Sequence, residues 1–167
     1  MKTNMILLGA AVISGLFALA QLGRHDLRTE TTINAPPERV WQVITNTAAY
    51  PQWNPVIVRL EGQLHPGQTI EFENRTGKNS MIFRPTILKA DQYRELRWLG
   101  RLWLPRLFDG EHYFILTPTP DGKTRLQHGE HFRGALVPFV KSWLNGEIKE
   151  GFTRINDALK TRAEDRT

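Results

Sequence analysis

The sequence contains no cysteine among its 167 residues. This absence excludes disulfides, thiolate metal sites and cysteine nucleophiles. The chain also has no serine-nucleophile motif, no P-loop, no dinucleotide fingerprint and no compact H-E-x-x-H zinc motif. We therefore expect no cofactor and no metal, and any acid–base chemistry has to rest on histidine and carboxylate side chains.

Long runs of one charge sign are also absent, although the formal net charge is +5. The densest basic stretch holds Arg94, Arg97, Arg101 and Arg106, interleaved with leucine and tryptophan. A basic, aromatic surface suits nucleic acid or anionic lipid. Because no nucleic-acid motif accompanies it, we expect solvated arginines on half-buried strands and no nucleic-acid partner.

Long apolar runs are confined to the amino-terminal end, where residues 5–20 carry no charge. A membrane-spanning helix needs about 20 apolar residues, so this run lies between a signal-peptide core and a short anchor. We expect residues 1–22 to be a signal peptide or membrane anchor, followed by a linker at residues 23–26. The protein is then exported or membrane-anchored. Cleavage after Ala20 and the side of the membrane stay open.

Residues 27–163 have the pattern of one α+β domain, with a polar tail at residues 164–167. Asn34 precedes an amphipathic helix that begins at Pro36-Pro37, and Asn34 is expected to cap it. Alternating or β-branched segments predict strands at residues 27–34, 56–62, 69–75, 81–89, 95–101, 110–117 and 124–132. Pro85 lies within one of them and indicates a bulge or an edge position.

The last third of the chain predicts one long helix from Leu136 to about Arg162. Its apolar residues recur at gaps of three, four and one, which is a helical stripe. They are Leu136, Val140, Trp143, Leu144, Ile148, Phe152, Ile155 and Leu159. An antiparallel sheet with one apolar face would pack against this helix as a second layer.

The segment INAPPERVWQVITNTAAYPQWNP at residues 33–55 resembles the opening of the START-like (SRPBCC, polyketide cyclase/dehydrase) superfamily. Three later patterns strengthen the resemblance: Trp98-Leu99-Gly100, Gly110-x-His112-x-Phe114 and His128-x-Glu130-x-Phe132-x-Gly134. The resemblance implies a helix-grip fold, in which a curved antiparallel sheet of about seven strands wraps around a long C-terminal helix and an apolar cavity.

The last predicted hairpin places polar groups on its apolar face. If its turn centres on Asp121, residues whose numbers sum to 242 face each other, so His112 pairs with Glu130 and Phe114 with His128. Cross-strand neighbours on one face lie about 5 Å apart. His112, His128 and Glu130 form the polar end of a ligand cavity, or they satisfy each other at the end of the sheet. As catalytic candidates, His112 and Glu130 can move a proton.

Aromatic residues form a second group on predicted inward faces or cavity rims. Some are expected to be ordinary core, namely Phe72, Trp143 and Phe152. The candidate ligand-binding residues are Trp53, Phe83, Trp98, His112, Phe114, His128, Glu130, Phe132 and Phe139. The apolar loop at residues 102–108 is expected to be a lid or to lie on a membrane.

Three functions remain open from the sequence. The first is binding of a small hydrophobic or amphipathic ligand, such as a lipid, a quinone or a polyketide-like molecule. The resemblance also implies a cyclase/aromatase-type enzyme that uses His112 and Glu130, or a protein-interaction or stress-related module. The expected partners are the small ligand and the membrane, through residues 1–22, and the protein is expected to be a monomer or a weak dimer.

Overall fold

The computed structural model describes residue 15, residues 23–76 and residues 79–165. Apart from residue 15, the predicted signal or anchor at residues 1–22 lies outside the described part of the chain. Within that part, no helix is both long enough and apolar enough to cross a membrane.

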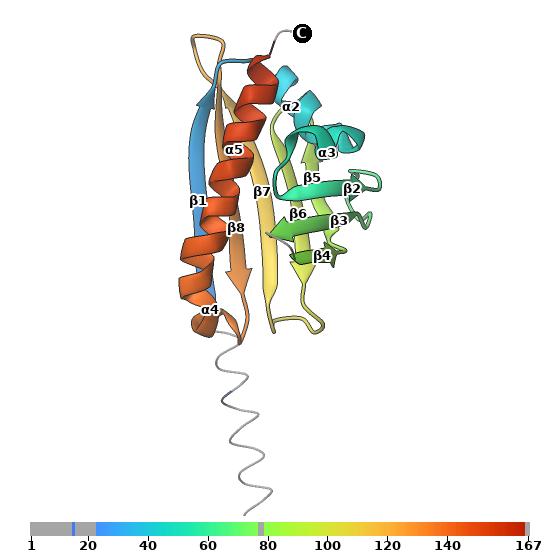
Figure 1. Cartoon of the computed structure of the whole chain (residues 1–167), viewed down its shortest axis with the longest axis vertical. Helices are drawn as coiled ribbons and strands as arrows, with labels where there is room; N and C mark the ends of the chain where they lie inside the picture. The colour runs from blue at the N-terminus through green and yellow to red at the C-terminus, as the bar shows by residue number, and fades with distance from the viewer. Residues whose placement is uncertain (1–14, 16–22, 77–78, 166–167) are drawn as a thin grey trace, which may run out of the picture.

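The described residues form eight strands in two antiparallel sheets (Figure 1). The five-stranded sheet has the order β1 (Arg24–Ile33), β8 (Thr124–Arg133), β7 (Asp109–Pro118), β6 (Glu95–Arg101) and β5 (Thr86–Asp91). The smaller sheet has the order β2 (Ile57–Glu61), β3 (Glu71–Thr76) and β4 (Asn79–Phe83). Strand β1 begins three residues before the expected start, so residues 24–26 belong to the sheet and not to a linker.

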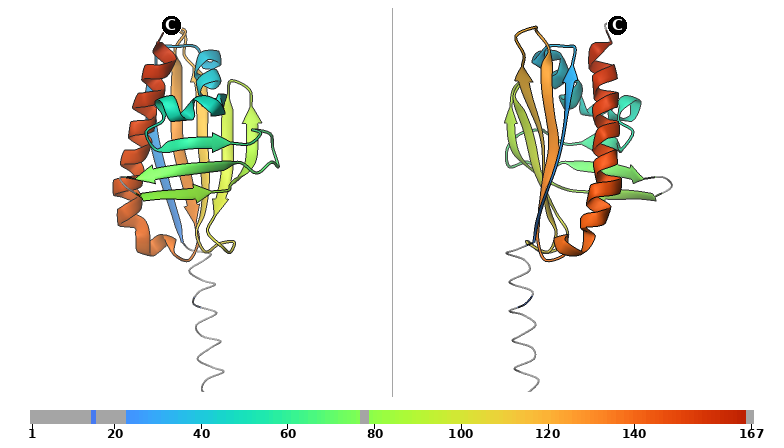
Figure 2. Two further views of the ribbon diagram at one scale, coloured as in Figure 1. Left: turned by 45° about the vertical axis from the view of Figure 1, so that its right-hand side comes forward. Right: turned by 90° about the vertical axis from the view of Figure 1, so that its left-hand side faces the viewer.

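Between residues 23 and 165, the helices lie on one side of the large sheet. They are α2 (Pro37–Thr45), the 3-10 turn η1 (Thr47–Ala49), α3 (Tyr50–Trp53), α4 (Val137–Trp143), the π-helical turn η2 (Leu144–Ile148) and α5 (Lys149–Glu164). Figure 2 shows α5 lying along the five-stranded sheet, with β2–β4 running across the direction of its strands. The predicted α+β helix-grip fold is confirmed.

Pro85 divides the strand predicted at residues 81–89 into β4 and β5. Proline has no backbone N–H to donate to a sheet ladder, so it suits the point where the chain leaves one sheet for the other. The Pro85 carbonyl accepts a hydrogen bond from the Ile70 N–H at 3.0 Å, and Thr69 and Thr86 form an isolated bridge. The two sheets are therefore joined at this proline.

The start of α2 differs from the prediction. Its N-cap is Pro36, without a side-chain hydrogen bond, and so Asn34 does not cap the helix. Instead, the Asn34 backbone N–H donates to Glu164 Oε1 at 2.6 Å, at the end of α5. The contact fastens the first and last elements of the domain to each other.

The predicted long helix is continuous but changes phase at η2. A π-helical turn adds a residue to the turn, which rotates the faces before and after it relative to each other. As a result Val137 of α4 and Leu144 of η2 are buried, while Phe139 is 73% exposed and Trp143 is 46% exposed. The predictions that Phe139 lines the cavity and that Trp143 belongs to the core are wrong.

Among the described residues, the buried apolar side chains form two clusters. The larger lies between α2, α5 and both sheets and includes Ile44, Leu96 and Ile155. The smaller consists of Leu27, Phe132, Val137, Leu144 and Phe152, near the α4 end. Both clusters contact the inward face of β7 and β8, and the polar residues of that face lie between them.

We predict that Ile155→Ala destabilises the fold by about 2–5 kcal/mol, because it deletes a fully buried side chain and leaves a cavity. Equilibrium denaturant unfolding measures the free energy of unfolding. The neighbouring exposed Arg154→Ala is the control and should leave it nearly unchanged. Equal effects of the two changes would contradict the packing described for α5.

Candidate functional site

The register of the last hairpin is as the sequence predicts. His112 faces Glu130, and Phe114 faces His128. His128 is fully buried and His112 is 5% exposed. The Glu130 side chain keeps 19% of its surface exposed. The prediction that three polar groups share the inward face of β7 and β8 is confirmed.

Aromatic rings enclose the two histidines. Trp98 stacks on His112 with ring centroids 4.4 Å apart and planes 5° from parallel. Phe114 stacks on His128 at 4.3 Å, and Phe152 covers the same imidazole at 4.4 Å. These contacts fix the orientation of both rings and exclude water from them.

A chain of hydrogen bonds crosses the site from β8 to α5 and back to β1. His112 Nε2 lies 2.9 Å from His128 Nε2, and His128 Nδ1 lies 2.7 Å from Asn156 Oδ1. Asn156 Nδ2 donates to Thr29 Oγ1 at 2.8 Å, and that hydroxyl donates to the His128 carbonyl at 2.8 Å. At the other end, His112 Nδ1 lies 3.5 Å from Glu130 Oε2.

The donors and acceptors in this chain of hydrogen bonds can be arranged in one consistent direction. Since the Asn156 oxygen only accepts, His128 carries its proton on Nδ1, and its Nε2 accepts from the Nε2–H of His112. The Nδ1 of a neutral His112 then carries no proton and faces the Glu130 carboxyl, whose Oε2 lies 3.5 Å away. The hydrogen bonds that join His112, His128 and Asn156 are all made when both imidazoles are uncharged.

Burial favours these uncharged forms. It lowers the pKa of His112 to about 3 and holds the pKa of His128 well below its usual range, where the neighbouring His112 adds to the effect. Burial also raises the pKa of Glu130 to about 8, against a smaller opposing effect of His131. The site is therefore a neutral polar layer between two apolar clusters.

Gly110 provides the space for the Glu130 carboxyl. A Cβ at position 110 would collide with Glu130 Oε1, whereas one at Gly100 on the neighbouring strand would meet nothing closer than 3.9 Å. No described residue forms a hydrogen bond to Glu130 Oε1. Within the polar layer, this oxygen is an acceptor that a ligand could use.

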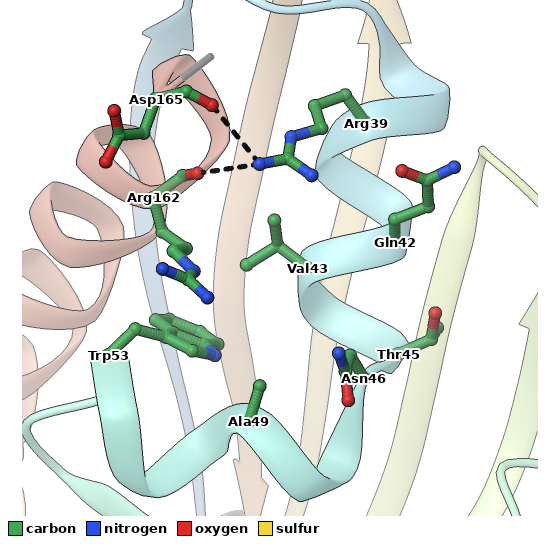
Figure 3. Close-up of a pocket in the computed structure, with 9 residues that line it drawn as sticks. All are labelled: Arg39, Gln42, Val43, Thr45, Asn46, Ala49, Trp53, Arg162 and Asp165. Carbon is green, nitrogen blue, oxygen red and sulfur yellow. Dashed lines mark hydrogen bonds between the residues drawn. The ribbon is translucent and has the colours of Figure 1, made fainter. Parts of the chain in front are cut away.

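The remaining candidate aromatics are divided between three places. Trp98, Phe114 and Phe132 are buried, and Phe83 reaches the site indirectly by stacking on Phe72, which contacts Trp98. Trp53 lines a separate hollow of about 480 Å³ between α2, α3 and the end of α5 (Figure 3). Trp53 is therefore not brought together with His112.

Three residues of the site were not among the candidates from the sequence. Asn156 is a polar residue inside the buried stripe of α5, next to Ile155, and this interruption was the available signal. Thr29 and Gly110 gave no comparable signal, because their roles arise from contacts with residues far along the chain. No group of three or more potential ligands among the described residues is placed to hold a metal ion.

Comparison with known proteins identifies what the chain is similar to. A family profile described as polyketide cyclase/dehydrase and lipid transport matches residues 24–164. No curated protein matches the sequence.

Solved structures share the fold at low sequence identity. The Zhui aromatase/cyclase from Streptomyces sp. R1128 is 14% identical with a TM-score of 0.70, over 86% of this chain and 95% of that one. Norcoclaurine synthase from Thalictrum flavum is 13% identical with a TM-score of 0.67, over 89% and 92%. The di-domain ARO/CYC StfQ from the steffimycin pathway is 15% identical with a TM-score of 0.70, over 86% and 51%. These likenesses establish the fold.

We predict that stability falls as the pH rises from 6.5 to about 8 and that Glu130→Gln abolishes this decline. Between 4.5 and about 8 the folded chain holds the Glu130 proton that the unfolded chain has released, so rising pH favours unfolding. His112 acts oppositely, but only below 6.5, where the unfolded chain binds its proton first. Denaturant unfolding at a series of pH values measures the effect, and equal slopes for the two proteins above 6.5 would contradict it.

We predict that Gly110→Ala returns the pKa of Glu130 toward its ordinary value, because the new methyl group drives the carboxyl away from its place over the strand. Carbon-13 NMR of the glutamate carboxyls against pH measures this shift. Gly100→Ala is the matched control on β6 and should leave the titration of Glu130 unchanged. A Gly110→Ala protein that folds and titrates like the wild type would disprove the assigned role of Gly110.

Proposed function

Since the chain belongs to the polyketide cyclase/dehydrase and lipid transport family, we propose that it binds a small hydrophobic or amphipathic molecule between the sheet and α5. The observation that supports this best is the neutral polar layer of Glu130, His112, His128 and Asn156 between two apolar clusters. Ligand sites are mostly apolar with a few placed polar groups, and this arrangement has that character.

The polar layer selects an uncharged head group. Its histidines are neutral, and the Glu130 carboxyl is neutral below a pH of about 8. With Oε2 on the His112 side, Oε1 can accept a hydrogen bond from a hydroxyl group. A carboxylate or phosphate would meet no cation in this layer, and its desolvation would be uncompensated. Lipids, reduced quinones and polyketide-like molecules with hydroxyl heads are therefore the candidate ligands.

An enzyme of the cyclase/aromatase type is the second candidate. The observation in its favour is the raised pKa of Glu130, which keeps a proton available for transfer near neutral pH. The contacts of His112 oppose it, because its Nε2 is hydrogen-bonded to His128 and its Nδ1 faces the Glu130 carboxyl at 3.5 Å. In the enzyme account, His112→Ala abolishes turnover while ligand binding survives.

We predict that the full chain, purified from its own host and examined by native mass spectrometry, retains a small apolar molecule with a hydroxyl head. Glu130→Ala should weaken its binding about tenfold, the effect of losing one hydrogen bond in a buried site. Glu150→Ala removes an exposed carboxylate from α5 and is the control. A folded chain that arrives empty and takes up no lipid, quinone or polyketide-like compound would contradict the proposal.

A further inference from the structure

The three most exposed large apolar side chains of the described surface gather at one end of the domain. They are Trp103, 84% exposed, Phe139, 73% exposed, and Leu104, 67% exposed. Trp103 and Leu104 lie in the loop between β6 and β7, and Phe139 lies on α4, at the same end of the large sheet (Figure 1). We call these three residues the apolar tip.

Backbone hydrogen bonds hold the loop against the start of α4. The Ala135 N–H donates to the Arg106 carbonyl at 3.0 Å, and the Leu136 N–H donates to the Leu107 carbonyl at 3.0 Å. Trp103 adopts a φ of 57°, a conformation that is costly for a bulky residue. A strained and outward-facing tryptophan gains nothing from the domain itself, which points to a partner outside it.

Basic residues surround the apolar tip. Arg101, Arg106, Arg133 and Lys141 are all exposed at this end. Acidic residues also lie at this end. The Asp109 carboxylate accepts from the Arg106 backbone N–H and lies 3.8 Å from the Arg101 guanidinium, Asp26 pairs with His131, and Glu147 accepts from Trp143. Apolar and tryptophan side chains ringed by arginine and lysine are the pattern of surfaces that enter anionic lipid headgroups.

The start of the chain also leads to this end. The Gly134 N–H, just before α4, donates to the Gly23 carbonyl at 2.9 Å. The uncharged sequence run at residues 5–20 ends three residues before Gly23, a reach of about 10 Å. A bilayer that holds this run would therefore lie next to the apolar tip.

We propose that the apolar tip docks on an anionic lipid bilayer. Three features favour a lipid surface over a protein partner. They are the position of the uncharged run at residues 5–20, the exposed apolar side chains of the tip and the basic residues around it. Docking would also place the bilayer beside the smaller apolar cluster. Phe108 of the same loop packs on Phe132 of that cluster, with the two ring centroids 5.4 Å apart. The proposal stands whether or not the site between the sheet and α5 holds a ligand.

The absence of cysteine makes a direct test possible. Leu104→Cys and Phe139→Cys are made separately in the full chain, labelled with an environment-sensitive fluorophore and reconstituted into vesicles of phosphatidylcholine and phosphatidylglycerol. The fluorescence emission of both labels should shift to the blue, and lipid-borne quenchers should reduce it. Tyr93→Cys lies in the turn at the opposite end of the large sheet and is the control. The emission of a label there should stay that of a fluorophore in water.

The composition of the vesicles tests the role of charge. Replacing phosphatidylglycerol by phosphatidylcholine should reduce the blue shift at positions 104 and 139 and leave position 93 unchanged. Aqueous signals at all three positions in anionic vesicles would overturn the proposal. So would efficient disulfide cross-linking between copies through Leu104→Cys in those vesicles, because a second copy of the chain would then be the occupant.

Discussion

The register between β7 and β8 places His112, His128 and Glu130 on the face that the large sheet turns toward α5. Charged groups would lose several kcal/mol each on burial at this place. The fold avoids that loss by keeping all three uncharged and by joining them to Asn156 and Thr29. The position of α5, the space at Gly110 and the stacking of Phe152 all serve this arrangement.

The polar chain also explains why the apolar interior is divided. The larger cluster fastens α2, α5 and the two sheets to each other, and the smaller cluster lies against α4 and the end of β8. The polar layer lies between them, and no described residue forms a hydrogen bond to its Glu130 Oε1. In the ligand site that we propose, this layer would select an uncharged head group, and the clusters on either side would contribute the apolar surface.

Sequence reasoning predicted the parts of this structure that depend on local pattern. Strand alternation and the Asp121-Gly122 turn were sufficient for the pairing of His112 with Glu130. The turn fixes which residues face each other, and the side-chain period of two puts them on the same face as Phe114 and Leu126. The phase of α4 was not predictable in the same way. Its π-helical turn rotates Phe139 outward, and no local signal in the sequence marks that turn.

Contacts between distant segments account for the other differences. Asn34 has the residue type of a helix cap, yet its backbone meets Glu164, which lies 130 residues later. The change of sheet at Pro85 depends on Ile70 and Thr69 lying opposite it. Position 110 needs a glycine because the Glu130 side chain of β8 occupies the space of a Cβ, and not because of the local backbone conformation. In each case the deciding partner becomes a neighbour only once the chain has folded.

Nitrogen-15 NMR of the histidine rings tests the central claim most directly, because it reports the protonation of each ring nitrogen. At neutral pH the account predicts a neutral His128 with its proton on Nδ1 and a neutral His112 with its proton on Nε2. An imidazolium at His112, or a proton on Nε2 of His128, would mean that Glu130 is ionised or that the chain runs in the opposite direction. Either result would contradict the neutral polar layer on which the proposed ligand site rests.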